Sequence, residues 1–250
     1  MPLDGTQRFS VRADAYSRYR PSYPAEAGAF LARECGLTSG SRIADIGSGT
    51  GLLAELFLRL GCDVYGVEPN LEMRKAAERL LAAEPRFHSV EGRAEATTLP
   101  DASVDLATAG QAFHWFDPAR AGTEIRRILK PGGWLVLMWN ERAPADAGLQ
   151  ADYDALVRRY APETRRIREN DIECVFGGRT WRLEQFPNGQ QLDGAGLEGR
   201  LSSSSYAPLP GTPEHAVMEE AAGQLFGRYQ DNGTVTLLYE TRVYVGQVGS

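Results

Sequence analysis

The chain has 250 residues, of which 42% are hydrophobic and 24% are charged, and its formal net charge is −6. These values are ordinary for a soluble globular protein, and the length suits one α/β domain. The negative charge argues against a protein that grips nucleic-acid phosphates without sequence preference. We find no apolar run long enough to span a membrane and no signal-peptide pattern, so we expect a cytoplasmic protein without membrane partners.

The three cysteines are few and widely spaced, at Cys35, Cys62 and Cys174. This usage fits a reducing compartment, and it contains no metal-binding pattern.

The N-terminal segment is both aromatic and basic. Residues 9–24 read FSVRADAYSRYRPSYP, and a short helix is predicted over Ala13–Tyr19. The helix would end before Pro21, because the residue before a proline avoids the α region. The segment either packs on the core through its aromatic rings or forms a lid whose Tyr19 and Arg20 face a ligand. Pro24 suits the first position of the next helix, which Gly36 ends.

Strands and helices alternate over the next hundred residues. The predicted strands are 42–45, 63–68, 87–91, 104–109 and 134–140, and helices are predicted over 52–60, over 71–83 and from 118 onward. Asn70 and Asp117 are the predicted N-caps of the last two helices, and KPGG at 130–133 reads as a turn. This alternation predicts a parallel sheet covered by helices on both faces.

The pattern changes beyond Asn140. Residues 149–160 and 213–230 are predicted helices, 181–186 is a predicted strand, and 194–205 is a Gly/Ser-rich passage. Arginines concentrate between Arg158 and Arg182, where they either recognise an acidic substrate or cover a solvated helix face. Alternation from Val235 to Val245 predicts an antiparallel strand added to the sheet.

The unusual groups of the sequence all follow predicted strands. They are the glycine loop 47–51 after the first strand, Glu68 at the end of the second, Ala94 and Glu95 after the third, and the segment 111–115 after the fourth. In a parallel sheet the carboxyl ends of the strands meet at one edge, and ligands bind there. We therefore expect one ligand site at this edge.

The loop reads IADIGSGTG, with glycines at Gly47, Gly49 and Gly51. A dinucleotide fingerprint needs a third glycine where this chain has Leu52, and a phosphate loop needs a lysine that is missing. These departures argue against a nicotinamide dehydrogenase. Asp45, just before the loop, would repel a pyrophosphate but could bind an amino group, directly or through water.

Glu68 ends the second strand, 21 residues after Gly47. A carboxylate at this place accepts hydrogen bonds from ribose hydroxyls. A ligand that joins an amino acid to a ribose without phosphate points to S-adenosylmethionine.

Several motifs together resemble a known family. DIGSGTG at 45–51, Glu68-Pro69, GRAE at 92–95 and LKPGG at 129–133 resemble class I S-adenosylmethionine-dependent methyltransferases. The YRPxYP-type segment 19–24 and QAFHWF at 111–116 resemble the small-molecule branch that includes trans-aconitate methyltransferase-like proteins. The resemblance covers roughly residues 16–140; the C-terminal third shares only the layout and names no substrate.

The resemblance implies a fold and a division of the chain. The fold would be an α/β, doubly wound, mostly parallel, Rossmann-like seven-stranded sheet with an antiparallel C-terminal strand and a helical cap. One domain would comprise an N-terminal lid and helix (1–36), a cofactor-binding core (37–140), substrate-cap insertions (141–233) and the final strand (234–246).

The resemblance also implies the cofactor-binding residues. Gly47, Gly49 and Gly51 would form the floor under the methionine part, and Asp45 would support its amino group. Glu68 would hold the ribose. Further contacts are implied for Pro69, Met73, Ala94 and Glu95 around the adenine, for Tyr19 and Arg20 over the methionine end, and for Gln111 near the sulfonium.

The chemistry implied is methyl transfer from S-adenosylmethionine to a small-molecule acceptor, with S-adenosylhomocysteine as product. Because the cofactor supplies the electrophile, the protein acts mainly by positioning. His114 is either a general base or a structural hydrogen-bonding group beside Trp115. The alternative function is a non-catalytic module that binds S-adenosylmethionine or S-adenosylhomocysteine. The sequence leaves open the acceptor and whether the protein is a monomer or a homodimer.

Overall fold

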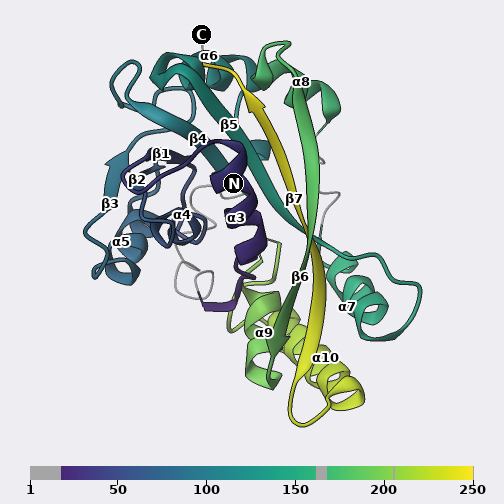
Figure 1. Cartoon of the computed structure of the whole chain (residues 1–250). Helices are drawn as coiled ribbons and strands as arrows, with labels where there is room; N and C mark the ends of the chain where they lie inside the picture. The colour runs from purple at the N-terminus through teal and green to yellow at the C-terminus, as the bar shows by residue number, and fades with distance from the viewer. Residues whose placement is uncertain (1–17, 162–167, 205, 250) are drawn as a thin grey trace. The chain divides into compact units, whose positions relative to one another are not determined.

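The computed structural model describes residues 18–161, 168–204 and 206–249 (Figure 1). Most of the helix predicted over 13–19 and the arginines Arg165 and Arg166 lie outside the described residues. The strands are β1 Arg42–Ile46, β2 Asp63–Glu68, β3 Phe87–Glu91, β4 Val104–Gly110, β5 Leu129–Arg142, β6 Trp181–Leu192 and β7 Val235–Gln247. The α-helices are α3 Ala25–Glu34, α4 Ala54–Leu58, α5 Leu71–Leu80, α6 Pro118–Ile128, α7 Gly148–Arg158, α8 Glu169–Phe176, α9 Gly194–Ser202 and α10 Pro213–Tyr229.

The strands form one seven-stranded sheet in the order β3-β2-β1-β4-β5-β7-β6. Strands β1 to β5 pair in parallel, and the C-terminal strands run antiparallel. The predicted fold class is therefore confirmed. The neighbours of β1 are β2 on one side and β4 on the other, so the strand order switches at β1 and β4. Ligands of such sheets bind at the carboxyl ends beside this switch.

The chain forms two compact units, each built from several segments. Unit 1 comprises Met1–Pro21, Glu141–Thr164 and Pro187–Glu240, and unit 2 comprises Ser22–Asn140, Arg165–Phe186 and Thr241–Ser250. Because both units are discontinuous in sequence, no single linker separates them. The predicted single domain stays a prediction.

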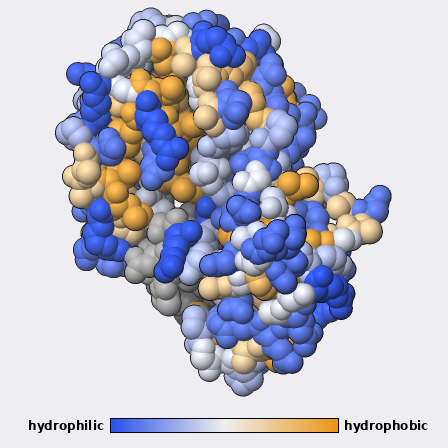
Figure 2. All heavy atoms as spheres, turned by 60° about the horizontal axis from the view of Figure 1, so that its bottom comes forward, coloured by the Kyte–Doolittle hydropathy of each residue, from blue (hydrophilic) through white to orange (hydrophobic). Residues whose placement is uncertain are grey.

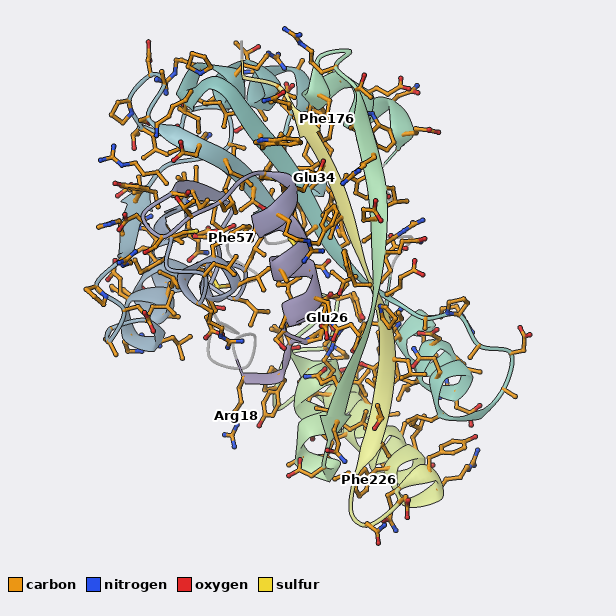
Figure 3. All side chains as sticks on the ribbon, in the orientation of Figure 1. Arg18, Glu26, Glu34, Phe57, Phe176 and Phe226 are labelled. Atoms are coloured by element: carbon orange, nitrogen blue, oxygen red, sulfur yellow. The ribbon has the colours of Figure 1, made fainter. Side chains whose placement is uncertain are left out.

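Unit 2 buries apolar side chains on both faces of its part of the sheet. One cluster joins the strands to α6 and α8, and the other joins them to α3 and α4. Phe57 of α4 and Phe176 of α8 are fully buried members of these two clusters (Figure 3). At the surface, Glu34 at the end of α3 pairs with Arg182 of β6 at 2.6 Å.

Unit 1 has a separate core formed by α7, α9, α10 and the unit 1 parts of β6 and β7. Tyr153 of α7 and Leu237 of β7 are fully buried in this core. Phe226 of α10 lies against the start of α9, where a Cβ on Gly194 would stand 3.5 Å from its ring (Figure 3). None of the described helices of either unit is long and apolar enough to cross a membrane.

The structure extends or corrects several predicted elements. Segment 130–133 lies inside the long strand β5 and is not a separate turn, and Pro24 is the N-cap of α3 rather than its first residue. Helices α8 and α9 had no predicted counterpart. Their helical geometry comes from packing, because Ile172 and Phe176 of α8 and Leu197 of α9 are buried in the cores. Tertiary packing of this kind overrides weak local propensity.

The cysteines differ in accessibility. Cys62 is buried and Cys35 is half-buried, whereas Cys174 on α8 is exposed. Burial raises the pKa of the Cys62 thiol to about 11 and, together with Glu34, that of the Cys35 thiol to about 12.

Candidate functional site

The glycine loop joins β1 to α4 in unit 2. Gly47, Gly49 and Gly51 all have positive φ, at 68°, 56° and 86°, a region that favours glycine. A Cβ on Gly47 would lie 2.7 Å from Cβ of Ala112, and one on Gly51 would lie 2.6 Å from Leu81. A Cβ on Gly49 would meet no described residue within 4 Å. The outer two glycines therefore fit the loop against the protein, while the described residues leave space at Gly49 for a ligand to approach the backbone.

Asp45 is fully buried near the end of β1. Neither of its carboxylate oxygens has a hydrogen-bond partner within 3.5 Å among the described residues. Burial raises the pKa of Asp45 to about 7, the charge of Glu68 adds to this rise, and the Ala54 backbone N–H weakly opposes it. A buried carboxylate without partners is costly, and a donor group on a ligand would offset that cost.

Glu68 holds the loop and the start of α5 in place. One carboxylate oxygen accepts a hydrogen bond from Gly49 N at 3.0 Å, and the other accepts one from Asn70 N at 2.9 Å. Burial raises the pKa of Glu68, and these two N–H groups oppose the rise. Each oxygen keeps lone pairs for further donors such as ribose hydroxyls.

The predicted adenine contacts are brought to the same edge of unit 2. Met73 and Ala94 are buried, Glu95 is half-buried and Pro69 is exposed. Glu95 is oriented by Asp117, whose backbone N–H donates to its carboxylate at 2.9 Å. Asp117 also caps α6, so the end of the β3 loop and the start of α6 are tied together.

The segment after β4 carries Gln111, His114 and Trp115. Gln111 has a φ of 56°, which is uncommon outside glycine, and its side-chain amide donates to Asn140 O at 3.1 Å. Such strained conformations cluster at functional sites. The His114 ring packs on Trp115 at a centroid distance of 4.9 Å, and Trp115 is 53% exposed. Figure 2 shows that hydrophobic residues gather in a patch on the face it displays.

Tyr19 and Arg20 belong to unit 1. The Tyr19 ring lies against Gly199 of α9, Gln190 of β6 donates to Tyr19 O at 3.0 Å, and Arg20 donates to Ser203 O at 3.2 Å. Their role over the cofactor stays a prediction.

Three polar residues were missed by the sequence reading. Arg74 is buried and donates to the carbonyls of Glu68 and Pro69, at 2.8 and 3.1 Å, and to Glu91 at 2.9 Å. Its place one helical turn after the cap Asn70 was a usable signal, because that turn faces the strand ends. The other two are Thr50 and Thr108.

Thr50 and Thr108 carry buried hydroxyls without hydrogen-bond partners among the described residues. Thr108 is the register partner of Asp45 on the adjacent parallel strand, so the two side chains project to the same face of the sheet. No sequence motif marks them.

These groups fit S-adenosylmethionine. Asp45 could accept from its ammonium group, Glu68 could accept from its ribose hydroxyls, and Gly49 leaves room at the loop. Within the described residues, no group of three or more His, Cys, Asp or Glu side chains is placed to hold a metal ion.

Comparison with known proteins identifies the family. A family model described as a methyltransferase domain matches residues 44–137. The chain is also 30% identical over 240 residues to a putative methyltransferase of Dictyostelium discoideum, and the alignment covers 92% of this chain and 89% of that protein. The chain belongs to the class I S-adenosylmethionine-dependent methyltransferase family.

Two other methyltransferases match this chain over different lengths. An uncharacterized methyltransferase of Mycobacterium tuberculosis is 42% identical over 139 residues, which are 56% of this chain and 54% of that protein. The chain thus spans about half the length of the mycobacterial relatives it matches. The solved structure of a putative type II methyltransferase from Anaeromyxobacter dehalogenans covers 92% of this chain and 99% of its own, with a TM-score of 0.70 and 22% identity. At that identity the likeness shows the methyltransferase fold.

Proposed function

We propose that this protein transfers a methyl group from S-adenosylmethionine to a small-molecule acceptor. The observation that carries the proposal is that two buried carboxylates, those of Asp45 and Glu68, lie at the glycine loop that contains Gly49. Neither carboxylate oxygen of Asp45 has a hydrogen-bond partner within 3.5 Å among the described residues, and Glu68 is held by two backbone N–H groups. Together they match a ligand with an ammonium group and a ribose, and family membership supports the same cofactor.

The residues would act mainly by binding and positioning. When bound, S-adenosylmethionine supplies an electrophilic methyl group. Asp45 would fix the ammonium group, Glu68 the ribose, and Pro69, Met73, Ala94 and Glu95 the adenine. Positioning of two reactants can supply several kcal/mol of rate acceleration.

His114 is the candidate base for an acceptor that must lose a proton. The alternative is a structural role, which its packing on Trp115 supports. The variant His114→Ala separates these roles, because a base is needed for turnover but not for cofactor affinity. Lost turnover with unchanged cofactor affinity would identify the base, and retained turnover would assign the structural role.

Titration calorimetry with S-adenosylhomocysteine tests the cofactor site. We expect binding to the wild type and a 10-fold to 100-fold loss of affinity in Glu68→Gln, because a ribose hydroxyl would lose a charged acceptor. The matched control is Glu91→Gln on β3, a surface carboxylate whose ion pair with Arg74 leaves it 79% exposed. Equal affinity in Glu68→Gln and Glu91→Gln would contradict the proposed site.

A labelled-methyl screen over small metabolites tests the reaction. Transfer to at least one acceptor is the expected result. Tight S-adenosylhomocysteine binding without transfer across a broad set would instead favour a non-catalytic binding module.

A further inference from the structure

A buried arginine in unit 1 has no acidic partner among the described residues. Arg200 of α9 is only 4% exposed. Its Nε donates to the Tyr239 hydroxyl at 3.1 Å, and its Nη1 donates to the Ser204 hydroxyl at 3.4 Å. Among the described residues, no carboxylate forms an ion pair with it. Both of its hydrogen-bond partners are therefore neutral.

A second arginine nearby is already neutralised. Arg142, at the end of β5, forms an ion pair with Asp154 of α7, and its guanidinium lies 6.0 Å from the centre of the Tyr153 ring. Among the described residues, Asp154 thus balances the charge of Arg142, whereas the charge of Arg200 has no paired anion.

The Tyr153 hydroxyl gives a second, independent indication of a ligand. Its side chain is fully buried, and its hydroxyl has no hydrogen-bond partner among the described residues. The Tyr153 hydroxyl and the Arg200 guanidinium are close enough to influence each other electrostatically. A buried hydroxyl without a partner beside a buried cation without a counter-ion is the arrangement expected of an anion site.

Burial of an unpaired charge is too costly for hydroxyl contacts alone to offset. An arginine cannot avoid this cost by losing its proton, because its pKa stays above the physiological range. A bound anion would offset this cost. Guanidinium groups bind carboxylates and phosphates through paired hydrogen bonds. The single charge of Arg200 favours a monoanionic carboxylate over a phosphate dianion.

We infer that Arg200, with the hydroxyls of Tyr153 and Tyr239, binds the carboxylate of a small organic acid in unit 1. The guanidinium would donate paired hydrogen bonds, and the Tyr153 hydroxyl would gain the partner that it lacks. The aromatic and aliphatic side chains of the surrounding core would contact the rest of the acid.

Titration calorimetry with acids and their neutral amides tests the site. The probes are acetate, succinate and benzoate, each paired with its amide, together with inorganic phosphate. We expect at least one acid to bind the wild type with one-to-one stoichiometry and at least tenfold more tightly than its amide. Equal binding of acids and amides, absence of binding by all acids, or tighter binding of phosphate would overturn the inference.

Three variants locate the binding. Arg200→Met should weaken the acid 10-fold to 100-fold, Arg200→Lys should weaken it less, and Tyr153→Phe should weaken it several-fold. In a buffer without organic acids, Arg200→Met should unfold at the same or a higher temperature than the wild type, because it removes an unpaired buried charge. A purely structural arginine predicts the opposite, a clear fall in unfolding temperature.

Tyr153→Phe keeps the test decisive if Arg200→Met fails to fold, because the lost hydroxyl makes no hydrogen bond in the described structure. Unchanged acid affinity in Tyr153→Phe together with unchanged affinity in Arg200→Lys would overturn the inference.

The same variants are titrated with S-adenosylmethionine, which also carries a carboxylate. Unchanged cofactor affinity supports a separate acid site, and loss of cofactor affinity without acid binding overturns it. Methylation of the bound acid would identify it as the acceptor, whereas binding without methylation would identify a separate ligand; both results support the site. Failure of the wild type to bind S-adenosylmethionine would contradict the proposed function but leave the acid titration readable.

Discussion

At the scale of single residues, we expect ionisation of Asp45 to affect both the free energy of unfolding and the binding of the cofactor. Its carboxyl is fully buried, and its native pKa of about 7 lies above the usual value near 4 of an unfolded chain. Between these pH values the native state binds more protons than the unfolded state. The free energy of unfolding therefore falls as pH rises through this window.

The variant Asp45→Asn removes this titration. Relative to the wild type without cofactor, we expect the variant to gain about 2 to 3 kcal/mol of stability between pH 5 and pH 8, from two pH units at 1.36 kcal/mol each. Urea unfolding at both pH values measures the difference. A constant stability difference would show that Asp45 does not titrate in this range.

The same residue predicts the pH dependence of cofactor binding. An ionised Asp45 attracts an ammonium group, so S-adenosylmethionine affinity should rise between pH 5.5 and pH 7.5, by at most about tenfold per pH unit. In Asp45→Asn the affinity should be lower and nearly independent of pH.

At the scale of elements, two glycines of the loop have different surroundings: Gly47 packs against the protein, and Gly49 is where we expect the ligand. Gly47→Ala would press a methyl group onto Ala112, which has no rotamer that could make room, whereas the methyl group of Gly49→Ala would meet no described residue within 4 Å. Both changes place alanine at positive φ, which costs about 1 to 2 kcal/mol.

We therefore expect Gly47→Ala to lose about 1 to 3 kcal/mol more stability than Gly49→Ala, as overpacking does. Gly49→Ala should stay folded and lose at least tenfold in S-adenosylhomocysteine affinity. Chemical unfolding and calorimetry check the two parts. Wild-type affinity in a folded Gly49→Ala would show that the ligand does not approach this glycine.

Helix α9 gives a second matched pair. A Cβ on Gly199 would lie 2.3 Å from the Tyr19 ring, whereas Gly227 on α10 is exposed and a Cβ there would meet no described residue within 4 Å. Alanine is preferred to glycine in a helix interior by about 1 kcal/mol. We expect Gly227→Ala to stabilise the protein by about that amount.

Gly199→Ala should bring no such gain, because it displaces Tyr19. Thermal unfolding of both variants measures the contrast. In the double variant Tyr19→Ala/Gly199→Ala, the stabilising effect of alanine at 199 should return; equal gains from both single variants would contradict the contact.

The elements also show what the sequence could predict. Strands β2 and β3 have their predicted bounds, and Asn70 and Asp117 are the caps that their side chains suggested. These features depend on local periodicity and capping chemistry. Helix α9 was missed because it is rich in glycine, ends at the start of a run of serines, and is stabilised by burial of Leu197 and Leu201.

The candidate site also contains residues that the sequence could predict and residues that it could not. The positions of Asp45, the loop glycines and Glu68 at the strand ends were predictable, because their spacing is itself a motif; their roles in binding stay predictions. Thr50 and Thr108 were not predictable, because each matters only through a buried hydroxyl that has no hydrogen-bond partner among the described residues. A buried residue without a partner cannot be recognised from its neighbours in sequence.

At the scale of the whole molecule, thiol reactivity follows from the burial of each cysteine. Cys174 is exposed, whereas burial protects Cys62 and raises the thiol pKa values of Cys62 and Cys35. Because the thiolate is the reactive form, we expect Ellman's reagent to react rapidly with one thiol per native chain. After unfolding, three thiols should react. Fast reaction of two thiols in the native protein would contradict this assignment.

The exposed thiol of Cys174 on α8 also allows site-specific labelling with a fluorescent dye. A maleimide fluorophore would attach at Cys174 in the natural sequence, and a second dye at Gly227→Cys would mark unit 1. Energy transfer between the dyes, followed one molecule at a time, would then test whether the distance between the two labelled sites differs with and without the methyl donor.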